Sequence, residues 1–332
     1  MDSQGGNDSR PGQHASDELY PAYREYAGLL EAGVTTLGLY PAGNGIPGRA
    51  VAIKPKGETA DEMVLSDDVY LKVMLRSNSS SKKMLRHGFE EADGYVEDEK
   101  KARDKYDKAK EKEEKAKKKS KDKEDKEDKG DGEATKELGP YVAPTPKPEA
   151  STFQALRDRE LRALISIGSA ADYLHLIDAI GEEEFDWDLR IRVISSLDIF
   201  YVKTELGKHA CRIVMEPSLS LHPNTRRQRN LPRELSDAGA KLVLIPRSDS
   251  VSGHKDWLHN TGELVGAGLS KDVALRAMTL EPAALLGLDE RLGSLSAGKD
   301  ANILFFKADP FEPGTLVEAV MLDGKIVYGE LN

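Results

Sequence analysis

One polar loop of this sequence contains residues of types that bind ligands. Residues 222–227 follow a short apolar run and contain Arg226 and Arg227. In parallel α/β folds, loops at the carboxyl ends of strands bind ligands, and a guanidinium pairs with a carboxylate through two hydrogen bonds. Arg226 and Arg227 are therefore candidate binding groups for a substrate carboxylate, and an ordinary solvated loop is the alternative.

Histidines are further candidate site residues, because the imidazole side chain ligates metals and titrates near neutral pH. His254 and His259 are five residues apart, close to the spacing of one helical face. We predict that His254 contacts substrate, together with Arg247 in the polar loop before it. Two solvated loop histidines are the alternative.

Three other kinds of site lack support. Residues 43–48 form a Gly-rich loop without the Gly-Lys-Ser/Thr ending of a phosphate-binding loop. The Gly-x-Ser-x-Gly motif of serine hydrolases is absent. The single cysteine, Cys211, excludes an internal disulfide and a Cys-x-x-Cys zinc motif.

The charged residues divide the chain into two parts. Residues 97–133 hold 15 Lys or Arg and 15 Asp or Glu among 37 residues, so the net charge of −10 belongs to the rest of the chain. This balance argues against nucleic acid as the main partner. The charged tract has no apolar stripe, and prolines between 140 and 148 follow it. We interpret residues 97–150 as an insertion or linker, partly a solvated helix, with an interaction arm as the alternative.

Hydropathy bears on the location of the protein. The apolar runs are too short to cross a membrane, and the first 17 residues lack the apolar core of a signal peptide. We expect no membrane partner and, by default, a cytoplasmic protein. We leave open whether the chain forms a homo-oligomer.

Helix and strand patterns alternate through most of the remaining chain, as expected for a parallel sheet in a barrel or a doubly wound fold. A helix, Gly33 and a strand over 34–39 open the series. From about Ser151, helices alternate with strands over 161–167, 189–194, 212–215 and 241–245. A helix over 231–238 precedes the last of these strands, and helices over 262–267 and 271–286 follow it. Residues 301–306 and 319–327 predict short antiparallel strands, with Asp323-Gly324 at a hairpin turn.

Several carboxy-terminal segments and one earlier segment resemble the metal-dependent amidohydrolase superfamily, in particular its imidazolonepropionase-like branch. The matching segments are residues 31–36, 274–283, 286–288, 291–302, 309–311 and 320–325. The resemblance implies a (β/α)8 barrel with a small β-sandwich, and hydrolysis of non-peptide C–N bonds at zinc-type divalent metals. It also implies that Asp249, after the last barrel strand, ligates metal and acts as general base; a helix N-cap is the alternative role.

Most of the ligands that this resemblance implies are missing. The family's His-x-His motif is absent, and Ser166 and Gly168 stand where one strand would carry histidine. The next strand, ending at Ser195 and Ser196, also lacks one. Since the sequence begins after the family's first strand, we expect an incomplete barrel.

The predicted organisation therefore has four parts: a disordered start over 1–16, a barrel over 17–96 and 151–290, the charged insertion over 97–150, and a β-sandwich portion over 291–332. Two functions remain. The chain is a hydrolase of non-peptide C–N bonds, or a catalytically inactive amidohydrolase-like barrel that binds a small molecule or partner.

Overall fold

The structure is a computed structural model that describes residues 8–124, 138–192, 197–209, 211–222 and 225–331. The chain divides into two compact units. The first comprises Met1–Arg86 and Ala155–Asn332, and the second comprises His87–Gln154. Among the described residues, no helix is both long and apolar enough to cross a membrane.

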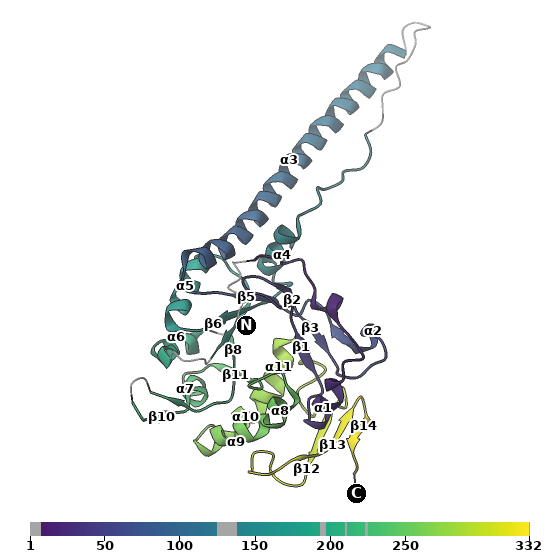
Figure 1. Cartoon of the computed structure of the whole chain (residues 1–332). Helices are drawn as coiled ribbons and strands as arrows, with labels where there is room; N and C mark the ends of the chain where they lie inside the picture. Colours follow the sequence, from purple (N-terminus) through teal and green to yellow (C-terminus); the bar gives the residue numbers. More distant parts are fainter. Residues whose placement is uncertain (1–7, 125–137, 193–196, 210, 223–224, 332) are drawn as a thin grey trace. The chain divides into compact units, whose positions relative to one another are not determined.

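A six-stranded sheet forms the centre of the first unit (Figure 1). Its parallel strands are β5 (Leu71–Met74), β6 (Ala163–Ile167), β7 (Trp187–Ile191), β8 (Arg212–Met215) and β11 (Lys241–Leu244), and β2 (Gly48–Arg49) pairs with β5 in the antiparallel direction. Neighbouring parallel strands follow chain order, as in a barrel, whereas a doubly wound sheet reverses that order at one point. The predicted barrel-type fold is therefore confirmed.

The parallel strands form because their sequences are almost continuously apolar. Every residue of β6 is buried, as expected for a parallel strand covered on both faces. Helices α5 (Ala170–Ile180), α6 (Lys203–Lys208) and α7 (Leu231–Asp237) lie along one side of the sheet (Figure 1). Gly239 has a φ of +99° directly after α7, a conformation that favours glycine, so the chain turns there into β11.

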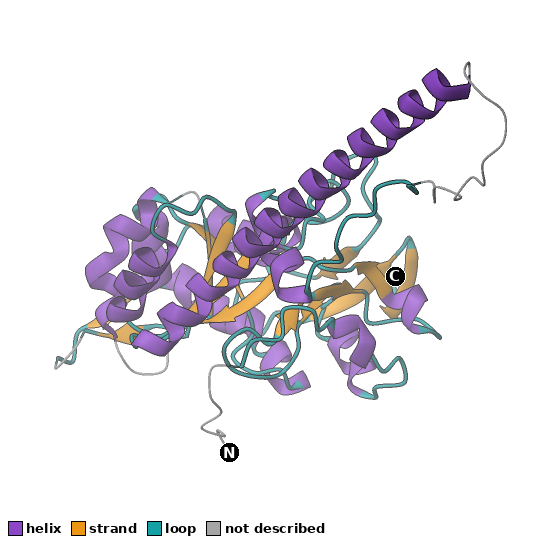
Figure 2. Ribbon diagram, turned by 90° about the horizontal axis from the view of Figure 1, so that it is seen from above, coloured by secondary structure: helices purple, strands orange, loops and turns teal. Residues whose placement is uncertain are grey.

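The opposite face of the sheet is covered by residues from the end of the barrel. Helices α10 (Lys271–Met278) and α11 (Leu280–Leu285) follow α8 (Val251–Lys255) and α9 (Trp257–Gly266). Figure 2 shows helices on both sides of the strands. One apolar cluster joins Leu285 and Leu286 to Tyr70, Leu164 and Val214. We call the face of the sheet that carries this cluster the inner face.

The single helix predicted over 271–286 is wrong. Thr279 has φ −128° and ψ −77°, outside the helical region, and separates α10 from α11. Pro282 lies in the first turn of α11, where its missing N–H breaks no helical hydrogen bond.

Two small antiparallel sheets lie beside the barrel portion. One contains β1 (Leu37–Leu39), β3 (Val51–Ile53) and β4 (Val64–Ser66), and the other contains β12 (Ile303–Phe306), β13 (Val317–Leu322) and β14 (Lys325–Gly329). Asp323 and Gly324 both have positive φ between β13 and β14, which confirms the predicted hairpin. Lys54 Nζ lies 2.8 Å from Asp323 Oδ2 and connects the two sheets.

The described part of the amino-terminal segment has a regular arrangement that we did not expect. Ser9 bridges Ile46, His14 bridges Arg49, and Ala15–Glu18 form a 3₁₀ helix, η1. Backbone pairing thus contradicts the predicted disorder for residues 8–16. Helices α1 (Glu25–Glu31) and α2 (Ala60–Met63), the 3₁₀ helix η2 (Leu197–Val202) and strands β9 (Ser220–Leu221) and β10 (Gln228–Arg229) complete the first unit.

Helix α3 (Ser79–Glu124) supplies most of the second unit, which also includes the first residues of α4 (Pro148–Arg157). The rings of Phe89 and Phe153 pack edge to face with centroids 4.9 Å apart, and Tyr106 and Tyr141 do so at 5.5 Å. These aromatic pairs place the segment after the charged tract against α3. The insertion predicted over 97–150 thus corresponds to a unit that begins and ends several residues outside that range.

Candidate functional site

Charged side chains gather toward the carboxyl ends of the strands on the inner face of the sheet. Because side chains alternate in a strand, residues two apart share a face. Lys72 follows Tyr70 on this face, Ser166 follows Leu164, and Glu216 follows Val214. Arg190 belongs to the same face, since it pairs in register with Ser166 and Val214. Charged groups from β5, β7 and the end of β8 are therefore directed to the same side, and Ser166 of β6 lies between them.

Lys72 and Arg190 meet on one aromatic ring. Lys72 Nζ lies 3.7 Å from the ring centre of Tyr40, and Arg190 Cζ lies 5.7 Å from it. Arg190 Nη1 also donates a hydrogen bond to the Tyr40 hydroxyl. Cation–π attraction grows when the cation is desolvated, and only 8% of Lys72 is exposed.

The pKa of Lys72 reports this environment. Burial first, and then the charges of Arg190 and Arg192, lower the pKa of Lys72 from 10.5 to about 8, while Asp249 acts in the opposite direction. Lys72 therefore loses a larger fraction of its charge near neutral pH than an exposed lysine would.

Glu216 is the carboxylate of this region. Burial raises the pKa of Glu216, and Asp249 raises it further, whereas Arg190, Arg247 and Arg192 lower it. These mutual effects define one electrostatic unit, which we call the inner-face cluster. Its members are Tyr40, Lys72, Arg190, Arg192, Glu216, Arg247 and Asp249.

Two of the predicted site residues belong to this cluster. Arg247 and Asp249 follow β11 in an exposed loop, and both act electrostatically on Glu216. Ser250, not Asp249, caps α8, because its side chain accepts a hydrogen bond from the Gly253 N–H at 3.1 Å. Asp249 is thus not occupied as the cap of α8.

The other predicted residues lie elsewhere. His254 is only 8% exposed, and its Nδ1 lies 2.9 Å from the Ser250 carbonyl oxygen, which favours a structural role over the predicted substrate contact. Arg226 and Arg227 are exposed in the loop between β9 and β10. Arg227 lines a pocket that is separate from the inner-face cluster, whereas Arg226 does not line this pocket.

The strand positions where the resemblance implied histidines have other roles. Ser166 is buried on the inner face, and the N–H of Gly168 donates to Asp172 Oδ2 at 2.9 Å. Ser195 and Ser196 lie outside the described residues.

A divalent metal does not fit the inner-face cluster as the described residues form it. Zinc-type sites use His, Cys, Asp and Glu ligands. The cluster offers two carboxylates, Glu216 and Asp249, beside one lysine and three arginines. The positive charges of these four side chains repel a divalent metal ion at short range. We therefore derive no step through a metal.

A different group of described residues brings three metal-type ligand atoms within 4.8 Å of one another: His14, Asp67 and Asp68. These atoms already take part in local contacts. His14 Nδ1 lies 2.7 Å from Asp68 Oδ1, Arg49 Nη1 lies 2.7 Å from Asp68 Oδ2, and Ser16 donates to Asp67. The group fixes the amino-terminal segment beside β2.

The sequence reasoning missed Lys72, Arg190, Arg192, Glu216 and Tyr40. A usable signal exists for four of them. Lys72 interrupts the apolar run 70–75, Arg190 and Arg192 alternate with apolar residues in 189–192, and Glu216 directly follows the apolar strand β8. Charged residues inside buried strands are rare enough to mark a site. Tyr40 has no comparable signal, because only the fold brings it to Lys72.

The parallel strands in chain order and the polar groups on their inner face define an α/β protein of the barrel type. The sequence profile described as "Amidohydrolase family" matches residues 70–327. The chain belongs to the amidohydrolase family.

Two known proteins are similar to this chain. An amidohydrolase from Thermotoga maritima MSB8 superposes with a TM-score of 0.73 at 18% sequence identity, covering 98% of this chain and 81% of that one, which supports the shared fold. The curated protein "Amidohydrolase tasK" of Hapsidospora irregularis is 40% identical over 63 residues. That match spans 19% of this chain and only 6% of the relative.

Proposed function

We propose that this amidohydrolase-family chain binds an anionic small molecule through the inner-face cluster. The main support for this proposal is that Lys72 and Arg190 both contact the side chain of Tyr40. With Arg192 and Arg247, four cationic side chains act on a region that holds two carboxylates. Guanidinium and ammonium groups recognise carboxylate and phosphate oxygens through charge-assisted hydrogen bonds.

Calorimetric titration with inorganic phosphate and with glutarate tests this proposal. Arg190→Gln is expected to weaken binding by about tenfold or more, because it removes a charge-assisted contact. Lys241→Gln is the matched control, since Lys241 is exposed at the amino end of β11. The proposal is wrong if neither anion binds saturably, or if both variants change the affinity equally.

Binding is also expected to weaken as the pH rises through about 8, where Lys72 loses its charge. In a Lys72→Met variant this part of the pH dependence should disappear. Persistence of the same pH dependence in that variant would exclude Lys72 from the site.

Hydrolysis of a non-peptide C–N bond is the second candidate, favoured by the family and by two carboxyl groups with unlike environments. Burial and Asp249 raise the pKa of Glu216, so Glu216 keeps its proton to higher pH than an exposed glutamate, as a general acid requires. In this scheme Asp249 takes a proton from water, and the water oxygen bonds to the amide carbon. The C–N bond breaks as Glu216 gives a proton to the leaving amine.

Incubation of N-acyl amino acids in ¹⁸O-labelled water, followed by mass spectrometry, tests this second candidate. Labelled acid from the wild-type chain, with a loss of about 10²-fold or more in Glu216→Gln and in Asp249→Asn, would support it. Asp256→Asn is the control, because Asp256 lies beyond the cluster, between α8 and α9. No labelled product while anion binding persists would exclude hydrolysis of these substrates and leave the binding proposal intact.

A further inference from the structure

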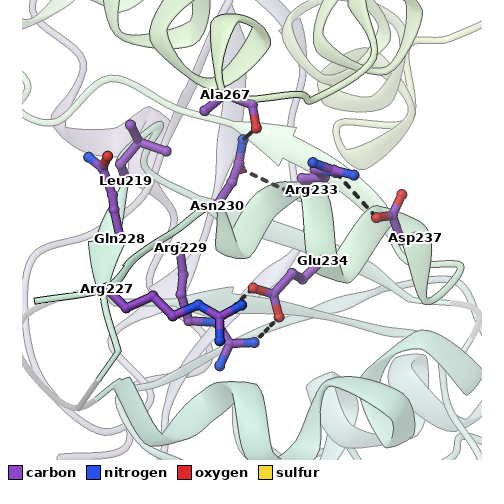
Figure 3. A pocket seen from close by; sticks show the side chains of 9 residues that line it. All are labelled: Leu219, Arg227, Gln228, Arg229, Asn230, Arg233, Glu234, Asp237 and Ala267. Atoms are coloured by element: carbon purple, nitrogen blue, oxygen red, sulfur yellow. Dashed lines mark hydrogen bonds and ion pairs between the residues drawn. The ribbon is translucent and has the colours of Figure 1, made fainter. Parts of the chain in front are cut away.

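A pocket lies between the hairpin β9–β10 and helix α7 (Figure 3). Its volume is about 320 Å³, and it shares no residue with the inner-face cluster. The lining residues are Leu219, Arg227, Gln228, Arg229, Asn230, Arg233, Glu234, Asp237 and Ala267.

Hydrogen bonds of Asn230 fix the walls of this pocket. The side chain of Asn230 accepts from the Arg233 N–H at 3.1 Å and so caps α7. Its Nδ2 donates to the Leu264 carbonyl oxygen at 2.8 Å, which connects the start of α7 to α9. Because Asn230 is buried, these hydrogen bonds are shielded from water.

The carboxylate of Glu234 is already neutralised by the protein. Arg229 Nε donates to Glu234 Oε1 at 2.7 Å, Arg229 Nη2 donates to Oε2, and Lys203 Nζ lies 2.9 Å from Oε2. Arg229 also stacks on Phe200 with its Cζ 4.3 Å from the ring centre. Arg229 and Glu234 therefore form a fixed wall that contributes little net charge.

Two arginines of the pocket are open to solvent. Arg227 is exposed and has no ion pair with any residue in the described part of the chain. Arg233 Nε lies 3.5 Å from Asp237 Oδ2, but the two side chains are 51% and 69% exposed, so this pair contributes little. Figure 3 shows Arg227 on the hairpin side of the pocket and Arg233 on α7.

We propose that this pocket is a second ligand site, which binds a small molecule through an oxyanion group, either a carboxylate or a phosphate. Arg227 would pair with the oxyanion, and Arg233 would add a second positive charge. The exposed Gln228 amide offers a further hydrogen-bond donor, and Leu219 and Ala267 offer apolar contacts to the rest of the ligand. This proposal stands apart from the proposed function, because it uses different residues.

Arginine footprinting on the full chain locates the site. Phenylglyoxal modifies accessible guanidinium groups, and mass spectrometry reports each residue separately. Inorganic phosphate and succinate are the two probes. We expect either probe to slow the modification of Arg227 and to leave Arg226 unchanged, because Arg226 is exposed but does not line the pocket. Stronger protection by phosphate would identify a phosphate ligand, and stronger protection by succinate a carboxylate.

Variants separate this site from the inner-face cluster. In an Arg190→Gln background, Arg227→Gln should weaken binding of the protecting anion by about tenfold, and Arg226→Gln should leave it unchanged. Equal protection of Arg226 and Arg227, or equal effects of their variants, would show only general attraction of anions to the loop and overturn the proposal. Protection of Arg227 that vanishes in Arg190→Gln would likewise overturn it, since the site would not be independent.

Discussion

The ammonium of Lys72 lies 3.7 Å from the centre of the Tyr40 ring, inside a protein interior where 8% of the lysine is exposed. The ring replaces part of the hydration that a buried cation loses. It also positions Arg190, whose guanidinium donates to the Tyr40 hydroxyl. Tyr40 is therefore a positioning residue for both cations of the inner-face cluster.

Removing the Tyr40 ring should lower the pKa of Lys72 below its value of about 8, because the charged form loses its cation–π partner. Tyr40→Leu tests this, and Tyr40→Phe is the control that keeps the ring. NMR titration of ¹³C-labelled lysine side chains measures the pKa. Equal Lys72 pKa values in the two variants would contradict the assigned role of the ring.

The low pKa of Lys72 makes stability depend on pH. The folded pKa of about 8 lies below the ordinary value of 10.5, so between these values the unfolded chain binds more protons than the folded chain. The free energy of unfolding therefore rises with pH through this window, by about 3 kcal/mol in total relative to a chain without this lysine. Urea unfolding of the wild type and of Lys72→Met from pH 7 to 11 measures the difference. A constant difference would mean that Lys72 titrates normally.

Asp188 should be much more sensitive to mutation than its neighbour Asp186. Arg162 lies 2.7 Å from the fully buried Asp188 and 3.6 Å from Asp186, which is 47% exposed. Asp188→Asn removes the buried carboxylate that pairs with the partly exposed Arg162 and should cost about 1.5–3 kcal/mol, whereas Asp186→Asn should cost less than about 1 kcal/mol. Urea unfolding measures both values. Similar losses in the two variants would contradict the importance of the buried pair.

Gly88 and Gly94 should respond in opposite ways to alanine. A Cβ at Gly88 would lie 2.1 Å from Phe153 Cζ, whereas a Cβ at Gly94 meets nothing within 4 Å. Gly88→Ala should therefore loosen the second unit, and Gly94→Ala should stabilise α3 by about 0.5–1 kcal/mol. Hydrogen exchange of the amides near Phe153 reports both effects. Slower exchange in Gly88→Ala than in the wild type would show that close packing between residue 88 and Phe153 does not limit the stability of the second unit.

Chelation should not destabilise this chain. The inner-face cluster presents a lysine and three arginines, which disfavour a divalent ion. We expect the same melting temperature with and without EDTA, and no shift on addition of zinc. A stoichiometric zinc-dependent rise would revive the metal site that the family resemblance implies.

Local patterns predicted most of the fold, because the strands are short apolar runs with clear boundaries. Strand β8 has the predicted bounds, and α7 ends one residue earlier than predicted. The break at Thr279 escaped prediction because both sides of it favour helix. The described residues 8–16 escaped because backbone pairing with residues near Ile46 and Arg49 cannot be read from a polar sequence.

The candidate site was less accessible from the sequence. Arg247 and Asp249 were found because they follow a strand within a recognisable motif. The contacts of Lys72 depend on the register of three strands and on a loop tyrosine more than thirty positions away, and local patterns contain no such information. Arg226 and Arg227 are adjacent in the sequence and lie in the same exposed loop, yet only one of them lines the pocket.

The place of the second unit in the sequence has a consequence for how the chain folds. Strands β5 and β6 pair in parallel, but the whole of His87–Gln154 lies between them. Bringing the ends of a longer loop together costs more entropy, about 0.6 kcal/mol for each doubling of its length. The pairs β6–β7 and β7–β8 enclose far shorter segments. We expect these pairs to form first, and β5 to join the sheet only after α3 and the segment that returns to α4 have packed together, so that a compact hairpin replaces an open loop.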